Sequence, residues 1–191
     1  MTQDERDRFL KAASEECREN RVFCHVLHFT GCRISEALEL TTSRILLPDQ
    51  EIIFRTLKKR KVDQNGNPRK EQYRHIPVPA KLIDELDLVF DLRRIQKQKR
   101  YGDELLWNMS RATAWRLIKK VMEKAEITGP QATPKGFRHG FGIAMAQTGM
   151  PLTILKDLLG HASTSTTEIY LQFAGKEKRE MVMKGWEKIN T

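Results

Sequence analysis

The chain has 191 residues, enough for one domain that buries roughly 70% of its unfolded surface without disulfide staples. Its 34 lysines and arginines outnumber its 25 acidic residues, and the net charge of +9 favours a polyanionic partner. Nucleic acid is favoured over a membrane surface, because no single basic amphipathic helix carries the charge. The three cysteines have no metal-ligand spacing and indicate free thiols in the cytoplasm. Without a signal peptide or an apolar stretch of about 18 residues, export and membrane insertion are not expected.

The first 40 residues have the periodicity of helices. Thr2 and Glu5 form a capping-box pattern at the start of the first helix. Gly31 breaks or bends the second helix, and helical periodicity resumes after it. Cys24 and Cys32 lie in an apolar stretch and are expected in the core. The helices are predicted at residues 2–16, 21–30 and 34–40.

The middle of the chain changes to the two-residue period of strands. Short strands are predicted at residues 44–47, 51–57 and 73–79. Pro48 and Asp49 mark the turn between the first two strands, and Asn65-Gly66 marks a turn between the last two. We therefore expect a small antiparallel sheet with a basic hairpin loop, although a basic run of this length is also compatible with a solvated linker.

The rest of the chain is predicted to be helical. Ser110 and Thr133 are expected N-caps, and Pro134 suits the first position of a helix. Gly149 and Gly160 end helices. Helices are predicted at residues 80–90 with a charged continuation over 91–100, and at 110–126, 134–148, 151–159, 163–173 and 176–189. The predicted class is α+β and mainly helical: a helical bundle with a small three-stranded antiparallel sheet.

Three side chains in the last third can converge on one phosphate. Arg138 offers a planar fork for phosphate oxygens, and His161 can donate a hydrogen bond. The hydroxyl of Tyr170 can act as a nucleophile. Each also has an ordinary structural interpretation: the tyrosine as a packed aromatic, the histidine as a helix cap, and the arginine as an ion-pair partner of Glu36 or Asp157.

With the Thr30-Gly-Cys-Arg33-Ile-Ser-Glu36 segment added, the chain resembles the tyrosine recombinases, also called the phage integrase family, in order and over nearly its whole length. The resemblance implies a single catalytic domain over residues 1–191, without the N-terminal core-binding domain that the family usually carries. Glu36 would support the active site, and Lys59 is the alternative to Lys58 in register. The implied catalytic residues are Arg33, Lys58, Lys135, Arg138, His161 and Tyr170.

The resemblance also implies a reaction. Tyr170 would attack a DNA phosphodiester and form a 3′-phosphotyrosine bond, while arginines stabilise the charge that builds on phosphorus. Lys58 would protonate the departing 5′-oxygen. No metal or nucleotide cofactor is implied. The C-terminal helix, with Trp186 as an anchor, would join protomers into a tetramer on DNA; packing on its own domain is the alternative.

Lys135 departs from the pattern of the family, which usually has histidine three residues before the second arginine. A lysine amine with its ordinary pKa is a poor base at pH 7. Either neighbouring cations depress it, or another group takes the proton from Tyr170. His139 is adjacent to Arg138 in sequence, but on a helix it points about 100° away from that arginine.

The leading hypothesis is a site-specific recombinase or integrase of a mobile element or plasmid, with double-stranded DNA as its partner. A catalytically impaired DNA-binding accessory factor and a type IB topoisomerase-like enzyme are the alternatives. His25, His28 and His75 match no ligand set and are interpreted as structural. The residues predicted to bind DNA phosphates are Lys59, Arg60, Lys61, Arg69, Lys70, Arg93, Arg94, Lys119 and Lys120.

Overall fold

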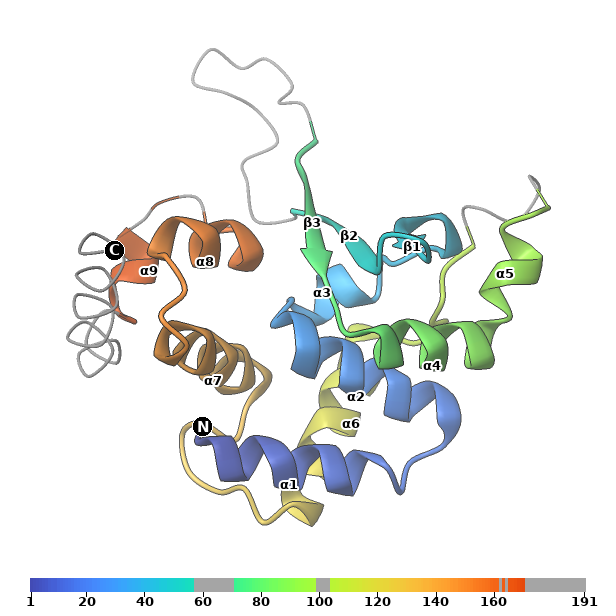
Figure 1. Cartoon of the computed structure of the whole chain (residues 1–191). Coiled ribbons are helices and arrows are strands. Elements are labelled where there is room, and N and C mark those ends of the chain that lie inside the picture. The colour runs from blue at the N-terminus through green and yellow to red at the C-terminus, as the bar shows by residue number, and fades with distance from the viewer. Residues whose placement is uncertain (57–70, 99–103, 162, 164, 171–191) are drawn as a thin grey trace, which may run out of the picture.

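The computed structural model describes residues 1–56, 71–98, 104–161, 163 and 165–170. These residues form a set of packed helices with a small antiparallel sheet at one side, and the mainly helical class with this sheet is as the sequence predicts (Figure 1). The α-helices are α1 (Gln3–Ala13), α2 (Arg18–Thr30), α3 (Ile34–Ala37), α4 (Ala80–Phe90), α5 (Leu92–Ile95), α6 (Arg111–Lys124), α7 (Pro134–Gln147), α8 (Leu152–Leu159) and α9 (Ser165–Glu168). Within the described part of the chain, no helix is both long and apolar enough to cross a membrane.

The sheet has the strand order β1-β2-β3, with both neighbouring pairs antiparallel. Its strands are β1 (Ile45–Leu46), β2 (Glu51–Arg55) and β3 (Tyr73–Pro77), each shorter than predicted. Leu105 forms an isolated bridge with Thr41. Along β3 the side chains alternate between exposed and buried, so Arg74 and Ile76 point inward. This alternation places the Arg74 side chain on the buried face of the sheet.

Helix boundaries follow the capping signals. The Thr2 hydroxyl accepts from the Glu5 backbone N–H at 3.2 Å, and the Glu5 carboxylate accepts from the Thr2 N–H at 2.7 Å. Helix α1 ends at Ala13, three residues earlier than expected. The predicted continuation over 91–100 is confirmed only as the short α5, because Asp91 has a φ of 52° and ends α4. Residues 99 and 100 of that continuation lie outside the described residues.

Gly31 ends α2 and determines where the segment that carries Arg33 begins. It ends α2 in the left-handed region, with a φ of 58°, and a Cβ at this position would overlap the Phe141 ring on α7. The chain then turns so that Arg33 is the N-cap of α3. Glycine is therefore required both for the turn and for the close approach of α7.

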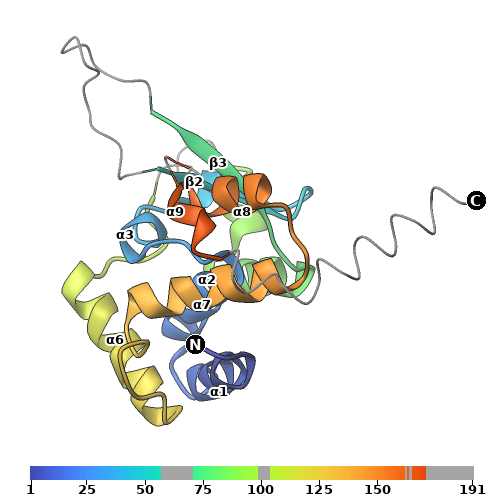
Figure 2. The same cartoon turned by 90° about the vertical axis from the view of Figure 1, so that its left-hand side faces the viewer.

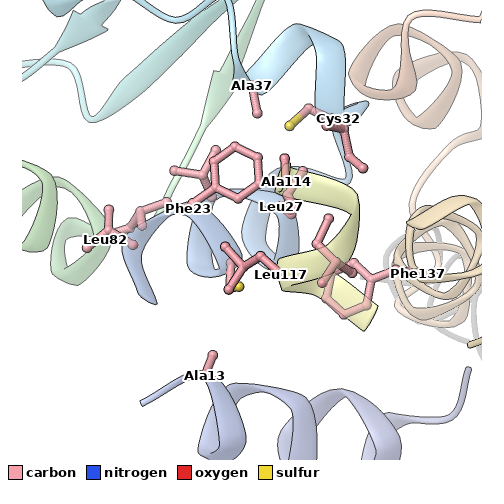
Figure 3. Close-up of a cluster of buried hydrophobic side chains, with 14 of the residues drawn as sticks. Ala13, Phe23, Leu27, Cys32, Ala37, Leu82, Ala114, Leu117 and Phe137 are labelled. Atoms are coloured by element: carbon pink, nitrogen blue, oxygen red, sulfur yellow. The ribbon is translucent and has the colours of Figure 1, made fainter. Parts of the chain in front are cut away.

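The main core joins α1, α2, α4 and α6 to the sheet. Figure 3 shows Phe23, Leu82, Leu117 and Phe137 converging in it, with Cys32 at its edge. Cys24 and Cys32 are buried, as predicted. Helix α7 lies between α1 and the α8–α9 pair (Figure 2), and it contributes to both the main core and a second, smaller cluster. The second cluster consists of Phe141, Ala146, Leu155, Leu159 and Tyr170.

Candidate active site

The site is built around Glu36, whose side chain is completely buried. Its Oε1 lies 2.5 Å from Nη1 of Arg33, and its Oε2 lies 2.6 Å from Nη2 of Arg74. The backbone N–H of Arg33 also donates to Oε2 at 2.8 Å. Arg138 Nη1 lies 3.9 Å from the same oxygen. One carboxylate thus gathers three guanidinium groups from α7, β3 and the start of α3.

Charge and burial oppose each other in this cluster. Burial raises the pKa of Glu36, but the charges and hydrogen bonds of Arg74 and Arg33 outweigh it, and the pKa is lowered. Burial, followed by repulsion from Arg33, lowers the pKa of Arg138 to about 10. Arg138 therefore remains charged at neutral pH, and the cluster holds three guanidinium groups around one carboxylate. The excess positive charge suits an anion such as a phosphate.

Arg138 is held rigidly by backbone carbonyls. Its Nη1 donates to the carbonyl of Gly31 at 2.9 Å, and its Nη2 donates to the carbonyl of Leu159. The two carbonyls belong to the last turn of α8 and the residue that follows α2. Arg138 therefore ties three helices together, and its guanidinium orientation is set before any ligand binds.

Arg74 is a member of the cluster that the sequence analysis missed. Its Nε donates to the Leu158 carbonyl at 3.0 Å, and its guanidinium lies 5.2 Å from the centre of the Phe54 ring. Its Nη1 lies 3.4 Å from the Thr56 hydroxyl. The alternation of β3 was the signal that could have found it, since the inward position of a half-buried strand seldom holds an arginine. Arg74 joins the sheet to the end of α8.

His161 lies immediately after Gly160, which ends α8 with a φ of 58°. Its Nδ1 lies 2.9 Å from the hydroxyl of the buried Thr167 on α9. Burial, then the charges of Arg138, Arg33 and Arg74, lowers the pKa of His161 to about 4. The imidazole is neutral at pH 7, and with Thr167 donating to Nδ1, its Nε2–H is free to donate to an anion.

A cleft of about 870 Å³ opens beside the cluster, between β3 and helices α7 and α8. Arg74, Gly160 and His161 lie along its wall. The rest of the lining mixes apolar side chains, such as Phe29 and Phe141, with polar and charged ones, such as Lys156 and Asp157. Arg33 and Arg138 do not line it, so the cleft adjoins the arginine cluster but is not itself the anion site.

Tyr170 is packed in the second core cluster and is only 3% exposed. Its ring lies against Gly142 on α7, where a Cβ would overlap it. The backbone N–H of Tyr170 donates to the Thr167 carbonyl at 3.0 Å. Thr167 therefore contacts Tyr170 through its backbone and His161 through its hydroxyl. Burial raises the pKa of Tyr170, and the charge of Arg138 acts in the opposite direction. The phenol is therefore protonated at neutral pH.

His139 contacts the Tyr170 hydroxyl. The histidine Nδ1 lies 3.3 Å from the phenolic oxygen, and the two ring centres are 5.1 Å apart. Lys135, one turn earlier on α7, is exposed, and its charge lowers the pKa of His139, after burial and the chain's amino terminus. His139 does point away from Arg138, as the helical geometry predicts. In that direction it meets Tyr170, a contact that the sequence alone did not reveal.

The described residues predicted to bind DNA already have intramolecular partners. Arg93 lies 3.2 Å from Asp87, and Arg94 contacts Asp91. Lys120 lies 2.9 Å from Glu16, and Lys119 donates to the Ala132 carbonyl at 2.8 Å. The remaining predicted residues lie outside the described part of the chain, as does the segment 176–189. These residues are Lys58, Lys59, Arg60, Lys61, Arg69 and Lys70.

Across the residues that the structure describes, no group of three or more His, Cys, Asp or Glu side chains could hold a metal ion. Of the histidines interpreted as structural, His28 is buried against Arg6, and His25 lies 2.5 Å from Glu85. His75 lies 2.9 Å from Glu51 at the surface of the sheet.

Comparison with known proteins identifies the fold. The chain is 29% identical to the tyrosine recombinase XerA of Pyrococcus furiosus over 95% of its own length and 60% of the relative's length. The catalytic domain of bacteriophage HP1 integrase superposes with a TM-score of 0.66 at 22% identity, covering 96% of this chain and 92% of that one. The XerH site-specific recombinase bound to a palindromic difH substrate, a post-cleavage complex, superposes with a TM-score of 0.72 at 22% identity. The match covers 98% of this chain and 53% of that one.

The chain therefore spans about 60% of the length of that curated relative. The model of the phage integrase family matches residues 1–177, the whole of the described region and all of the clustered side chains. By this match, this chain belongs to the phage integrase family.

Proposed function

We propose that the chain is the catalytic domain of a site-specific DNA recombinase or integrase, of the kind that mobile elements and plasmids carry. It breaks and rejoins strands through a 3′-phosphotyrosine intermediate. The observation that carries the proposal is the gathering of Arg33 and Arg138 around the buried Glu36. His161 is close enough to both arginines for their charges to lower its pKa. Tyr170 follows after the short helix α9.

In this proposal the two arginines bind the non-bridging oxygens of the scissile phosphate. Arg33 and Arg138 stabilise the negative charge that increases in the transition state, and their fixed anchoring avoids reorganisation during reaction. The neutral His161 adds a hydrogen bond to the same oxygens. Removing one donor of such a site typically costs ~10²–10³ in rate.

Tyr170 is the nucleophile. Its oxygen bonds to phosphorus as the bond to the 5′-oxygen breaks, and the energy of the phosphodiester is retained in the phosphotyrosine. The leaving 5′-oxygen takes a proton from Lys58, or from Lys59 in the alternative register. A 5′-hydroxyl of a partner strand then reverses the attack. Because Tyr170 is 3% exposed, we infer that DNA binding uncovers its hydroxyl while the tyrosine stays in contact with α7.

Double-stranded DNA is the proposed partner. The net charge of +9 and the DNA-bound state of the XerH relative support it. The basic run 58–61 and residues 69–70 supply the phosphate contacts, whereas Arg93, Arg94 and Lys120 are weaker candidates because carboxylates already neutralise them. If about six phosphates are neutralised, the log–log dependence of affinity on salt has a slope near −5.

Assembly on DNA is proposed to proceed through the C-terminal segment. Residues 176–189 have an amphipathic pattern, with Trp186 as the anchor into a neighbouring protomer. The test is deletion of residues 176–191, followed by measurement of self-association on DNA. Loss of assembly supports the exchange, and unchanged assembly contradicts it.

The decisive experiment is covalent trapping. Labelled, nicked duplex DNA from the protein's own genetic neighbourhood is mixed with the chain and separated on a denaturing gel. We expect a labelled protein band that disappears in Tyr170→Phe. Tyr73→Phe, an exposed tyrosine on β3, is the matched control and should keep the band.

A second candidate function is a DNA-binding accessory factor with impaired catalysis. Lys135 at the usual histidine position favours it. DNA that binds the protein tightly but yields no covalent band would favour this function. Relaxation of supercoiled DNA without a defined site would instead favour a topoisomerase-like enzyme.

A further inference from the structure

The proposed reaction needs a group that accepts the proton of Tyr170. Lys135 lies in the first turn of α7, where its ammonium group is exposed to solvent. An ammonium group has no lone pair and cannot accept a proton. The acceptor must therefore be another group within hydrogen-bond reach of the phenol.

His139 meets that requirement. Its Nδ1 lies 3.3 Å from the Tyr170 oxygen, and the rings are inclined by only 35° with their centres 5.1 Å apart. Both residues sit on fixed supports: His139 on the second turn of α7, and Tyr170 in a cluster with Phe141 and Leu155. The contact is thus produced by the packing of Tyr170 against α7.

We propose that His139 is a catalytic residue, the general base that accepts the proton of Tyr170 during strand cleavage. The inference rests on the proposed function of the chain. The Tyr170 O–H bond breaks, and its proton moves to Nδ1 of His139. The phenolic oxygen bonds to phosphorus, and the bond from phosphorus to the 5′-oxygen breaks. The general acid protonates the leaving oxygen, and religation returns the His139 proton to Tyr170.

The groups around His139 keep it ready to accept a proton. It faces the Tyr170 hydroxyl, Lys135 one turn earlier on its own helix, and the amino terminus of the chain. Burial, the amino terminus and Lys135 together lower its pKa below the ordinary value of 6.5, so the ring is neutral at pH 7. The pKa of Tyr170 is raised above its ordinary value of 10.0. Free phenolate therefore does not form in advance, and the proton moves as the bond to phosphorus forms.

Lys135 acquires a different role in this arrangement. Its positive charge opposes protonation of His139 before the reaction. The chain thus places the base one helical turn after the usual histidine position. Lys135→Gln should shift the pH dependence of cleavage toward higher pH, because His139 loses a neighbouring cation and its pKa rises.

The test separates a base from a residue that only holds the tyrosine. His139→Asn keeps an acceptor near the position of Nδ1 but does not take up a proton. We expect it to form the covalent adduct ~10²–10⁴-fold more slowly than the unmodified chain. Incorporation of difluorotyrosine at position 170, whose phenol is more acidic, should restore most of that loss. His75→Asn, an exposed histidine on β3, should have no effect.

Each outcome has a distinct meaning. If the unmodified chain forms adduct and His139→Asn forms it equally fast, His139 is not the base, although the proposed function stands. If the loss is not restored by difluorotyrosine, the histidine only positions the ring, which also contradicts the proposal. If the unmodified chain forms no adduct on DNA that it binds, the proposed function itself fails, and the inference fails with it.

The pH profile supplies an independent measurement. The rate should fall on the acid side as His139 becomes protonated, because an imidazolium accepts no further proton. His139→Asn should flatten this limb. If His139→Asn keeps the same fall in rate at acid pH, the titrating group is not His139.

Discussion

The carboxylate of Glu36 binds Arg33 through Oε1 at 2.5 Å and Arg74 through Oε2 at 2.6 Å. The first arginine begins the helix that carries Glu36, while the second arrives from a strand 38 residues later. Because the side chain of Glu36 is completely buried, water cannot take the place of either arginine as a partner of its carboxylate. A single acidic residue therefore sets the relative position of the sheet and the first arginine of the site.

Replacement of this carboxylate should be costly. Glu36→Gln leaves Arg74 and Arg33 without their counter-charge, and breaking a buried pair in this way typically costs ~3–5 kcal/mol. Urea denaturation of both proteins measures the difference. Glu39→Gln is the matched control: its partner Arg55 is partly exposed, and we expect at most about 1 kcal/mol. Equal losses in the two variants would contradict the central role of Glu36.

Arg74 should not be replaceable by lysine. Its Nη2 binds Glu36 while its Nε binds the Leu158 carbonyl, and an ammonium group lacks the fork that reaches both. Arg74→Lys is expected to lower the rate of adduct formation more than ~10-fold, with DNA affinity changed far less, because the turn that carries His161 loses its anchor. Arg55→Lys, in a more exposed pair, provides the control. An unchanged rate in Arg74→Lys would limit Arg74 to a contribution to stability.

Gly142 should be coupled to Tyr170. A Cβ at Gly142 would overlap the tyrosine ring, so Gly142→Ala should destabilise the chain by ~1–3 kcal/mol. In a Tyr170→Ala background the overlap is absent, and the better helix propensity of alanine should stabilise α7 by up to about 1 kcal/mol. The four proteins form a double-mutant cycle that thermal or urea denaturation can measure. Additive effects would mean that the ring moves aside without cost.

The sequence was sufficient for the type and order of the main elements and for the position of Arg33, but not for every helix and strand end. Capping signals at Thr2, Ser110 and Thr133 predicted helix starts that the structure confirms. Gly31 and Gly160 ended helices where predicted, because only a left-handed conformation continues the chain there. Asp91 misled the prediction of a continuous helix, since an aspartate in the left-handed region gives no local signal as clear as glycine does.

The missed residues depended on contacts that are distant in sequence. Arg74 meets Glu36 only after the sheet has formed, and His139 meets Tyr170 only after α8 and α9 have returned the chain to α7. The side of α7 on which His139 lies was predictable, but its contact with Tyr170 on that side was not. Thr167 is a further case, since its contact with His161 requires the turn between α8 and α9.

His28 should make the stability of the protein depend on pH. It is buried beside Arg6, whose Nη2 lies 3.4 Å from its Nε2. Burial, then the charges of Arg6 and His25, lowers the pKa of His28 to about 3, compared with 6.5 when unfolded. Between these values the unfolded chain binds the proton and the folded chain does not. Stability therefore is lost progressively as the pH falls from about 6.5 toward 3.

The expected loss from this residue is about 2 kcal/mol between pH 7 and pH 5. Thermal denaturation across this interval should show a shallower dependence on pH in His28→Gln than in the unmodified chain. His75→Gln, which replaces an exposed histidine, should keep the full dependence. If His28→Gln has the same slope as the unmodified chain, the folded protein admits a proton at His28, and the packing of α1 against α2 around Arg6 must open in mild acid.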